Sequence, residues 1–80
     1  MHEVSAMSEI FEIINQNIES YSLKKVNKVV VKIGESSCID ESSIKFSFET
    51  MAKGTICENA QIVIEKVKGH ELLLDSIEGE

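Results

Sequence analysis

Apolar side chains recur at intervals of three and four residues over the first quarter of the chain. This interval is the spacing of residues on one face of a helix. The stripe consists of Val4, Met7, Phe11, Ile14, Ile18 and Tyr21, with Ile10 and Ile13 beside it. It predicts a helix over about residues 5–21 whose apolar face packs into a core, while Glu9 and Glu12 face water.

A strand pattern follows this helix. Val29, Val31 and Ile33 alternate with Lys28 and Lys32, which is typical of a half-buried strand. The pattern predicts a strand over residues 26–33, with one side toward the core and the other toward solvent.

A second helix is predicted from Asp40 to about residue 53. An aspartate at this place can accept hydrogen bonds from the free backbone N–H groups of the first turn. Ile44, Phe48 and Met51 have the helical spacing of a buried face, and Gly54 is typical of a helix end.

Two further strands are predicted over about residues 60–67 and 71–77. The connection over residues 68–70 is so short that it predicts an antiparallel hairpin, and the strand–helix–strand segment before it predicts a parallel crossover. The expected fold class is therefore α+β, in the order α-β-α-β-β, with a three-stranded mixed sheet and two helices packed on one face. The other face would be polar, with Lys28, Lys32, Lys66 and Glu65, and the outer strands would leave two open edges.

The length and net charge of the chain exclude several classes of function. Eighty residues fit a single domain, residues 1–80, with a core that supplies only about 3–5 kcal/mol of net stability. Eight basic and fourteen acidic side chains give a net charge of −6, which argues against nucleic acid as a partner. Apolar runs such as Val29-Val30-Val31 are far shorter than the ~20 residues of a membrane span, and no leader pattern opens the chain. We expect a cytoplasmic protein with no membrane partner.

The cysteines predict no zinc site. Cys38 and Cys57 lie nineteen positions apart without a CxxC pair, and neither they nor His2 and His70 have the close spacing of zinc ligands. We expect two buried, reduced thiols instead. No glycine-rich phosphate loop and no nucleophile–base pattern occurs, so we do not expect an enzyme.

The chain opens with a group of residues that can chelate a metal ion. The Met1 amine, the backbone nitrogen of His2 and the His2 imidazole can close fused rings around one ion. Planar nitrogen donors point to Ni(II) or Cu(II). On spacing alone, a solvated terminus with no metal role remains the alternative.

Several segments, taken in order, resemble the HypA family, the nickel metallochaperones of [NiFe]-hydrogenase maturation. They cover residues 1–5, 29–35, 46–49, 53–55, 60–65, 69–72 and 76–78, beginning with Met1-His2-Glu3-Val4-Ser5. The chain departs from the family in one respect. The family's zinc ribbon, with two CxxC pairs between the second and third strands, is absent at about residues 67–70. We interpret the chain as a single nickel-binding domain left by an engineered deletion, with a natural minimal member as the alternative.

The resemblance implies Ni(II) as the bound metal and no zinc. His2 would be the principal ligand, with the Met1 amine and the backbone nitrogens of His2 and Glu3 completing a planar set. The Glu3 carboxylate would be an outer or axial group, and Asp40 a second-shell candidate whose alternative role is the helix cap. His70 could substitute as a ligand, although a histidine in a turn is usually only solvated.

The implied partners are the GTPase HypB, the hydrogenase large subunit and, in some organisms, urease accessory proteins. The alternative function is a small protein–protein interaction domain that uses a sheet edge and has no specific metal role. Open edges and a short connection between the last two strands also raise the prospect of a strand-swapped or edge-paired dimer.

Overall fold

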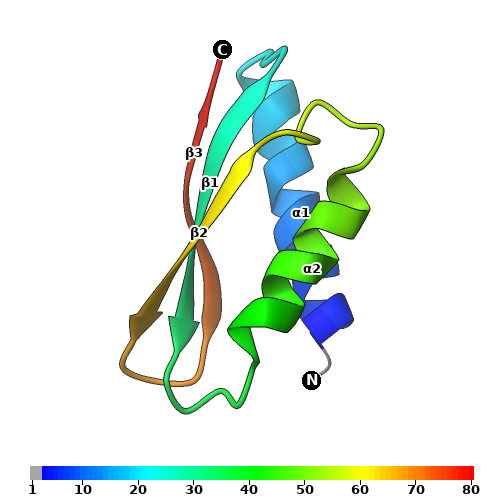
Figure 1. The fold of residues 1–80 in the computed structure, drawn as a ribbon. Coiled ribbons are helices and arrows are strands. Elements are labelled where there is room, and N and C mark those ends of the chain that lie inside the picture. Colours follow the sequence, from blue (N-terminus) through cyan, green and yellow to red (C-terminus); the bar gives the residue numbers. More distant parts are fainter. Residues whose placement is uncertain (1–2) are drawn as a thin grey trace.

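Two helices cover one face of a three-stranded sheet (Figure 1). The computed structural model describes residues 3–80, with side chains from Ala6 onward. The elements follow in the order α1 (Glu3–Ser20), β1 (Val26–Gly34), α2 (Glu41–Ala52), β2 (Gln61–Val67) and β3 (Leu72–Gly79). The predicted α+β class and the order α-β-α-β-β are therefore confirmed. Among the described residues, no helix is both long and apolar enough to cross a bilayer.

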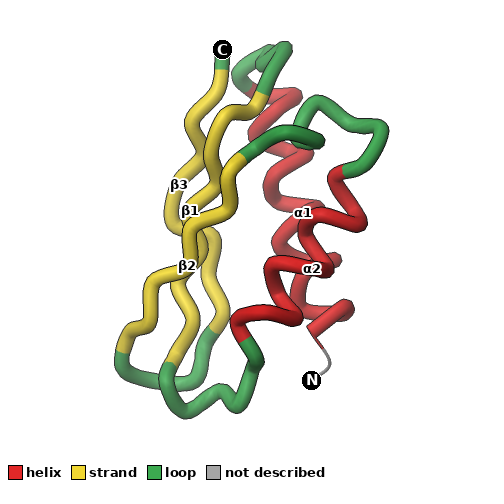
Figure 2. Tube along the Cα trace, in the orientation of Figure 1, coloured by secondary structure: helices red, strands yellow, loops and turns green. Residues whose placement is uncertain are grey.

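β1 is the central strand of the sheet, which has the order β2-β1-β3. It pairs in parallel with β2, as the predicted crossover requires, and antiparallel with β3. The predicted hairpin is wrong, because β2 and β3 lie on opposite sides of β1 and are not neighbours (Figure 2). The short connection over residues 68–71 passes across the end of β1 instead of turning back beside β2.

Three backbone hydrogen bonds hold this crossing in place. The N–H of Gly34 donates to the carbonyl of Glu71 over 2.7 Å, and the N–H of Glu35 donates to the carbonyl of Val67 over 2.8 Å. The N–H of Ser36 donates to the carbonyl of Gly69, also over 2.8 Å. The crossing therefore satisfies polar backbone groups that the end of a central strand would otherwise leave unpaired.

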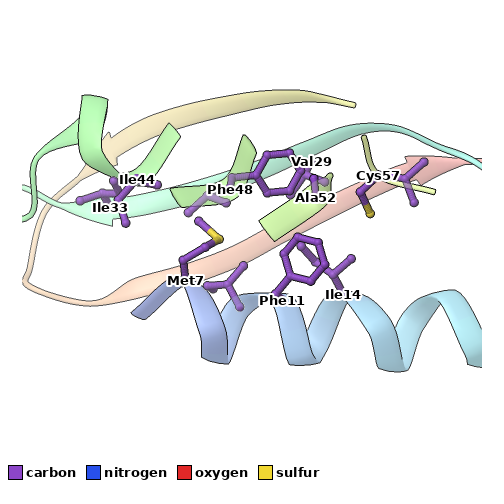
Figure 3. Packing of buried hydrophobic residues seen from close by; sticks show 12 residues of the cluster. Met7, Phe11, Ile14, Val29, Ile33, Ile44, Phe48, Ala52 and Cys57 are labelled. Atoms are coloured by element: carbon purple, nitrogen blue, oxygen red, sulfur yellow. The ribbon is translucent and has the colours of Figure 1, made fainter. Parts of the chain in front are cut away.

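The core lies between the sheet and the helices, and the predicted periodicities account for most of it (Figure 3). Its buried members are Met7, Ile10, Phe11, Ile14, Val26, Val29, Val31, Ile33, Ile44, Phe48, Ala52 and Cys57. Phe11 of α1 and Phe48 of α2 join the helices, with ring centroids 5.8 Å apart. Met51 is only half-buried against this cluster.

Two residues of the predicted apolar stripe lie outside the core. Tyr21 is 73% exposed because α1 ends at Ser20, and the positive φ of Ser22 turns the chain just after it. Ile13 is 42% exposed and lies on the side of α1 nearest to β3. The helical stripe that packs into the core is therefore narrower than the sequence pattern predicts.

The outer face of the sheet carries cross-strand ion pairs. Lys28 reaches Glu78 over 3.6 Å, and Lys32 reaches Asp75 over 3.3 Å. These contacts confirm the predicted polar face. Lys66 does not belong to it, because its register partner is Ile33, whose side chain points toward the helices.

Candidate metal site

The predicted metal ligands stand at the start of α1. Met1 and His2 lie outside the described residues. Glu3 is the first residue of the helix. The N–H groups of the first turn of a helix have no partner within the helix. The backbone nitrogen of Glu3 can therefore bind a metal ion without the loss of a helical hydrogen bond.

Asp40 is the N-cap of α2. Its carboxylate oxygen Oδ2 accepts a hydrogen bond from the backbone N–H of Ser43 over 3.0 Å and another from the Ser43 hydroxyl over 3.1 Å. The backbone of Asp40 is extended, with φ −79° and ψ 127°, as the cap position requires. The capping role is confirmed. Because both hydrogen bonds go to Oδ2, the second carboxylate oxygen can accept from a further donor.

Three segments that are distant in the sequence meet at the end of the molecule where α1 begins (Figure 1). A hollow of about 520 Å³ lies between the first turns of α1, the loop before α2 and the connection before β3. Its walls include Ala6, Glu9, Ile39, His70 and Glu71. Asp40 follows Ile39 directly and therefore belongs to the same end of the molecule as the start of α1.

His70 is exposed at the wall of this hollow. Within the part of the chain that the structure describes, no group of three or more His, Cys, Asp or Glu side chains is placed to hold a metal ion. The described side chains at this end therefore do not form a metal site by themselves.

The two cysteines have different surroundings. Both thiols are free, but Cys57 is fully buried in the core whereas Cys38 is exposed in the loop before α2. Burial raises the pKa of the Cys57 thiol above its ordinary value of 9.0, and a hydrogen bond with Thr55 opposes this only in part. The predicted burial is confirmed for Cys57 and wrong for Cys38. Cys38 has a positive φ of 59° and lies in the irregular loop between β1 and α2, where no apolar periodicity indicates burial.

The model of one protein family matches residues 1–77, and that family is described as hydrogenase/urease nickel incorporation, metallochaperone, HypA. The chain belongs to the HypA family. The match includes Met1-His2-Glu3 and continues through β2 and the crossing into β3, as far as residue 77. Metallochaperones deliver metal ions rather than catalyse reactions, so family membership agrees with the expectation that this chain is not an enzyme.

Curated relatives bear the same family name. The hydrogenase maturation factor HypA of Legionella pneumophila (strain Lens) is 35% identical over 72 residues, which are 90% of this chain and 64% of the relative. The hydrogenase maturation factor HybF of Escherichia coli (strain K12) is 38% identical over 64 residues, covering 80% of this chain and 57% of the relative. The chain thus spans little more than half to two thirds of the length of these HypA-type proteins.

Two solved HypA structures share the fold. The solution structure of the nickel metallochaperone HypA from Helicobacter pylori aligns with a TM-score of 0.75 at 26% identity, covering 95% of this chain and 72% of that one. The solution structure of another HypA protein aligns with a TM-score of 0.78 at 24% identity, covering 100% of this chain and 97% of that one. The chain therefore shares its two-helix, three-stranded fold with solved HypA proteins.

Proposed function

We propose that this chain is the nickel-binding part of a HypA-type metallochaperone and holds Ni(II) at its N-terminus for delivery in [NiFe]-hydrogenase maturation. The observation that carries the proposal is the family match, which starts at residue 1 and so includes Met1-His2-Glu3. The ligands would be the Met1 amine, the His2 imidazole and the backbone nitrogens of His2 and Glu3.

The chemistry of this donor set supports nickel. Four nitrogens in fused rings make a planar site, which suits Ni(II) and Cu(II) and does not suit tetrahedral Zn(II). Because α1 begins at Glu3, loss of the proton from its backbone nitrogen costs the helix no hydrogen bond. Two deprotonated backbone nitrogens also balance the charge of the ion, so the positive end of the helix dipole does not repel the complex.

The position of the site supports transfer of the metal. A chain terminus is open to a second set of ligands, whereas a closed cage of side chains would have to unfold to release its ion. Asp40 lies at the same end of the molecule and, with its second carboxylate oxygen, could accept a hydrogen bond from a nitrogen ligand. The Glu3 carboxylate would act as an outer or axial group. These two acids would stabilise the bound ion without closing the site.

We further propose that residues 1–80 form one nickel-binding domain and that the family's zinc ribbon is absent at residues 67–70. The chain matches the family on both sides of this point but covers only 64% of its Legionella relative. The crossing closes with backbone hydrogen bonds over these residues, so the domain needs no ribbon to complete its sheet. The proposed partners are HypB, the hydrogenase large subunit and urease accessory proteins, in the cytoplasm.

Calorimetric titration of Ni(II) into the untagged chain tests the nickel site. We expect one equivalent to bind, His2→Ala to abolish binding, and His70→Ala to leave it unchanged, since His70 is the other imidazole of the chain. Unchanged affinity in His2→Ala would contradict the proposal. A version with two residues added before Met1 keeps the imidazole but moves the amine. An unchanged absorption spectrum of its nickel complex would rule out the amine as a ligand.

A further inference from the structure

The free edge of the sheet at β3 runs beside a groove that begins at the hollow near the start of α1 and extends far beyond it. β3 pairs with β1 along one side only, and α1 covers this half of the sheet while α2 covers the β2 half (Figure 2). Two adjoining hollows, of about 520 and 500 Å³, lie between α1 and β3. Both are lined by Ile13, and together they follow β3 from Leu72 to Gly79.

Exposed apolar side chains gather along this groove. Five large apolar residues of the described chain are exposed. Two of them, Ile13 and Tyr21, line the groove on the helix side. A third, Leu73, lies at the same edge but is in register with Lys32 and so belongs to the outer face. The exposed fractions of these three residues are 42%, 73% and 49%. Half-buried core residues such as Leu74 and Ile77 form the floor of the groove beside them. A strand added to β3 would therefore meet apolar side chains on its helix-facing side.

The outer side of the same edge is acidic. The segment from Glu71 to Glu80 carries four carboxylates and no lysine, and its outward side chains include Asp75 and Glu78. Glu9 adds a further carboxylate at the wall formed by α1. A strand on this edge would place its outward side chains beside Leu73, Asp75 and Glu78, whose two carboxylates also pair with lysines of β1.

The strand that already lies next to β3 has the complementary pattern. In β1, Val29 and Val31 face the helices, while Lys28 and Lys32 face outward and pair with Glu78 and Asp75. The opposite flank of β3 has no strand beside it among the described residues. It presents Leu72, Leu74 and Ile77 on the helix side, and Leu73, Asp75 and Glu78 on the outer side. The best occupant is one that alternates apolar with basic residues, as β1 does.

We propose that the β3 edge is a docking site for an extended segment of a partner protein in which apolar residues alternate with Lys or Arg. The segment would add to the sheet as a fourth strand by backbone pairing. A bulge at Asp75 divides the edge, because Val30 pairs with Ser76 and Val31 with Leu74. We therefore expect the added strand to pair with Leu72–Leu74 and, beyond the bulge, with the rest of β3.

A second copy of this chain is a poorer occupant. Pairing of two β3 edges would bring eight carboxylates of the two Glu71–Glu80 segments together without a lysine between them. Like charges on directly opposed residues destabilise a sheet. The proposed docking site does not require bound nickel. Experiments on the metal-free chain therefore test it independently of the metal site.

The probe is the synthetic peptide Lys-Val-Lys-Ile-Lys-Val-Lys, blocked at both ends and titrated into the ¹⁵N-labelled, metal-free chain. We expect it to shift the amide signals of β3 and to slow their hydrogen exchange. The peptide Glu-Val-Glu-Ile-Glu-Val-Glu should bind at least about tenfold more weakly. Ile13→Ala should weaken binding of the basic peptide about five- to tenfold, whereas Phe46→Ala, an exposed apolar residue on α2, should not change it.

Four results of these experiments would contradict the proposed docking site. Protection of β2 amides instead of β3 amides would place docking at the wrong edge. Equal binding of the acidic peptide would remove the basis for a basic partner. Protection of β3 that rises with protein concentration in the absence of peptide would make a second copy the occupant. No effect on β3 at millimolar peptide would exclude strand addition there.

Discussion

Gly34 and Gly69 lie against each other where the chain crosses the end of β1. A Cβ added to Gly34 would lie 2.4 Å from the carbonyl oxygen of Gly69 and 2.5 Å from the backbone nitrogen of His70. Both neighbours are backbone atoms, which cannot rotate away as a flexible side chain can. Gly69 has a φ of +107°, a conformation that favours glycine at the crossing itself. The close approach therefore requires glycine at position 34, whereas at position 69 there is space for a side chain and only the positive φ favours glycine.

Gly34→Ala is expected to destabilise the fold strongly. The added methyl group must push the connection away from β1, which costs about 1–3 kcal/mol, a large part of the ~3–5 kcal/mol available to a domain of this size. Gly54→Ala is the control, because Gly54 has a φ of +77° but open space around it, so only the backbone conformation is strained. We expect urea unfolding to show a larger loss for Gly34→Ala. Equal losses would mean that the connection does not approach β1 this closely.

The contact between the two helices predicts a pair of contrasting variants on α2. Phe48 is 1% exposed and stacks at an angle on Phe11, whereas Phe46, two residues earlier, is 71% exposed. Phe48→Ala should cost about 3–5 kcal/mol and leave the chain largely unfolded at room temperature. Phe46→Ala should change the free energy of unfolding by no more than about 0.5 kcal/mol. Circular dichroism during urea unfolding measures both, and similar losses would contradict this placement of α2.

The helices and strands could be predicted from the sequence because each depends on local spacing. Strand order could not be predicted in the same way, because it depends on which side of β1 the last strand packs. A four-residue connection favours a hairpin when only length is considered. The informative signals were Gly34 and Gly69, which allow the crossing, and the Val29-Val30-Val31 run, which suits a central strand.

The candidate site, like the fold, could be predicted from the sequence only in part. The capping role of Asp40 follows from its place before a helical pattern, and the structure confirms it. The meeting of the β1–α2 loop, the start of α1 and His70 at one hollow depends on tertiary packing, which no spacing along the chain encodes. The ligand role of Met1-His2-Glu3 remains a prediction, because it rests on the donor chemistry and on the family.

The two roles of Asp40 predict different effects for two substitutions. Asp40→Asn keeps an oxygen that can cap α2, so stability should change by only a few tenths of a kcal/mol, whereas Asp40→Ala should lose about 1 kcal/mol. If Asp40 also supports the nickel site, Asp40→Asn should weaken Ni(II) binding because it removes the negative charge. Urea unfolding and nickel calorimetry on both variants separate the effects. Unchanged nickel affinity in both variants would limit Asp40 to the cap.

Cys57 gives the fold a sensitivity to alkaline pH. Its thiol is buried, which raises its pKa in the folded chain above the value of 9.0 that it has when exposed. As pH rises through 9, the unfolded chain loses this proton first, so the stability of the fold falls with rising pH. Below pH 9 the thiol is neutral in both states and the effect vanishes. Over the window above 9 the slope can approach ~1.4 kcal/mol per pH unit.

Comparison of Cys57→Ala with Cys38→Ala isolates this effect from the lysines, which also titrate at high pH. We expect wild type and Cys38→Ala to lose the same amount of stability between pH 8 and pH 10, since Cys38 is exposed in the folded chain. Cys57→Ala should be less stable at pH 8, because it leaves a cavity, but should lose less on going to pH 10. The free energy of unfolding in urea at the two pH values gives the comparison. A pH-dependent loss in Cys57→Ala as large as in wild type would show that the buried thiol does not cause it.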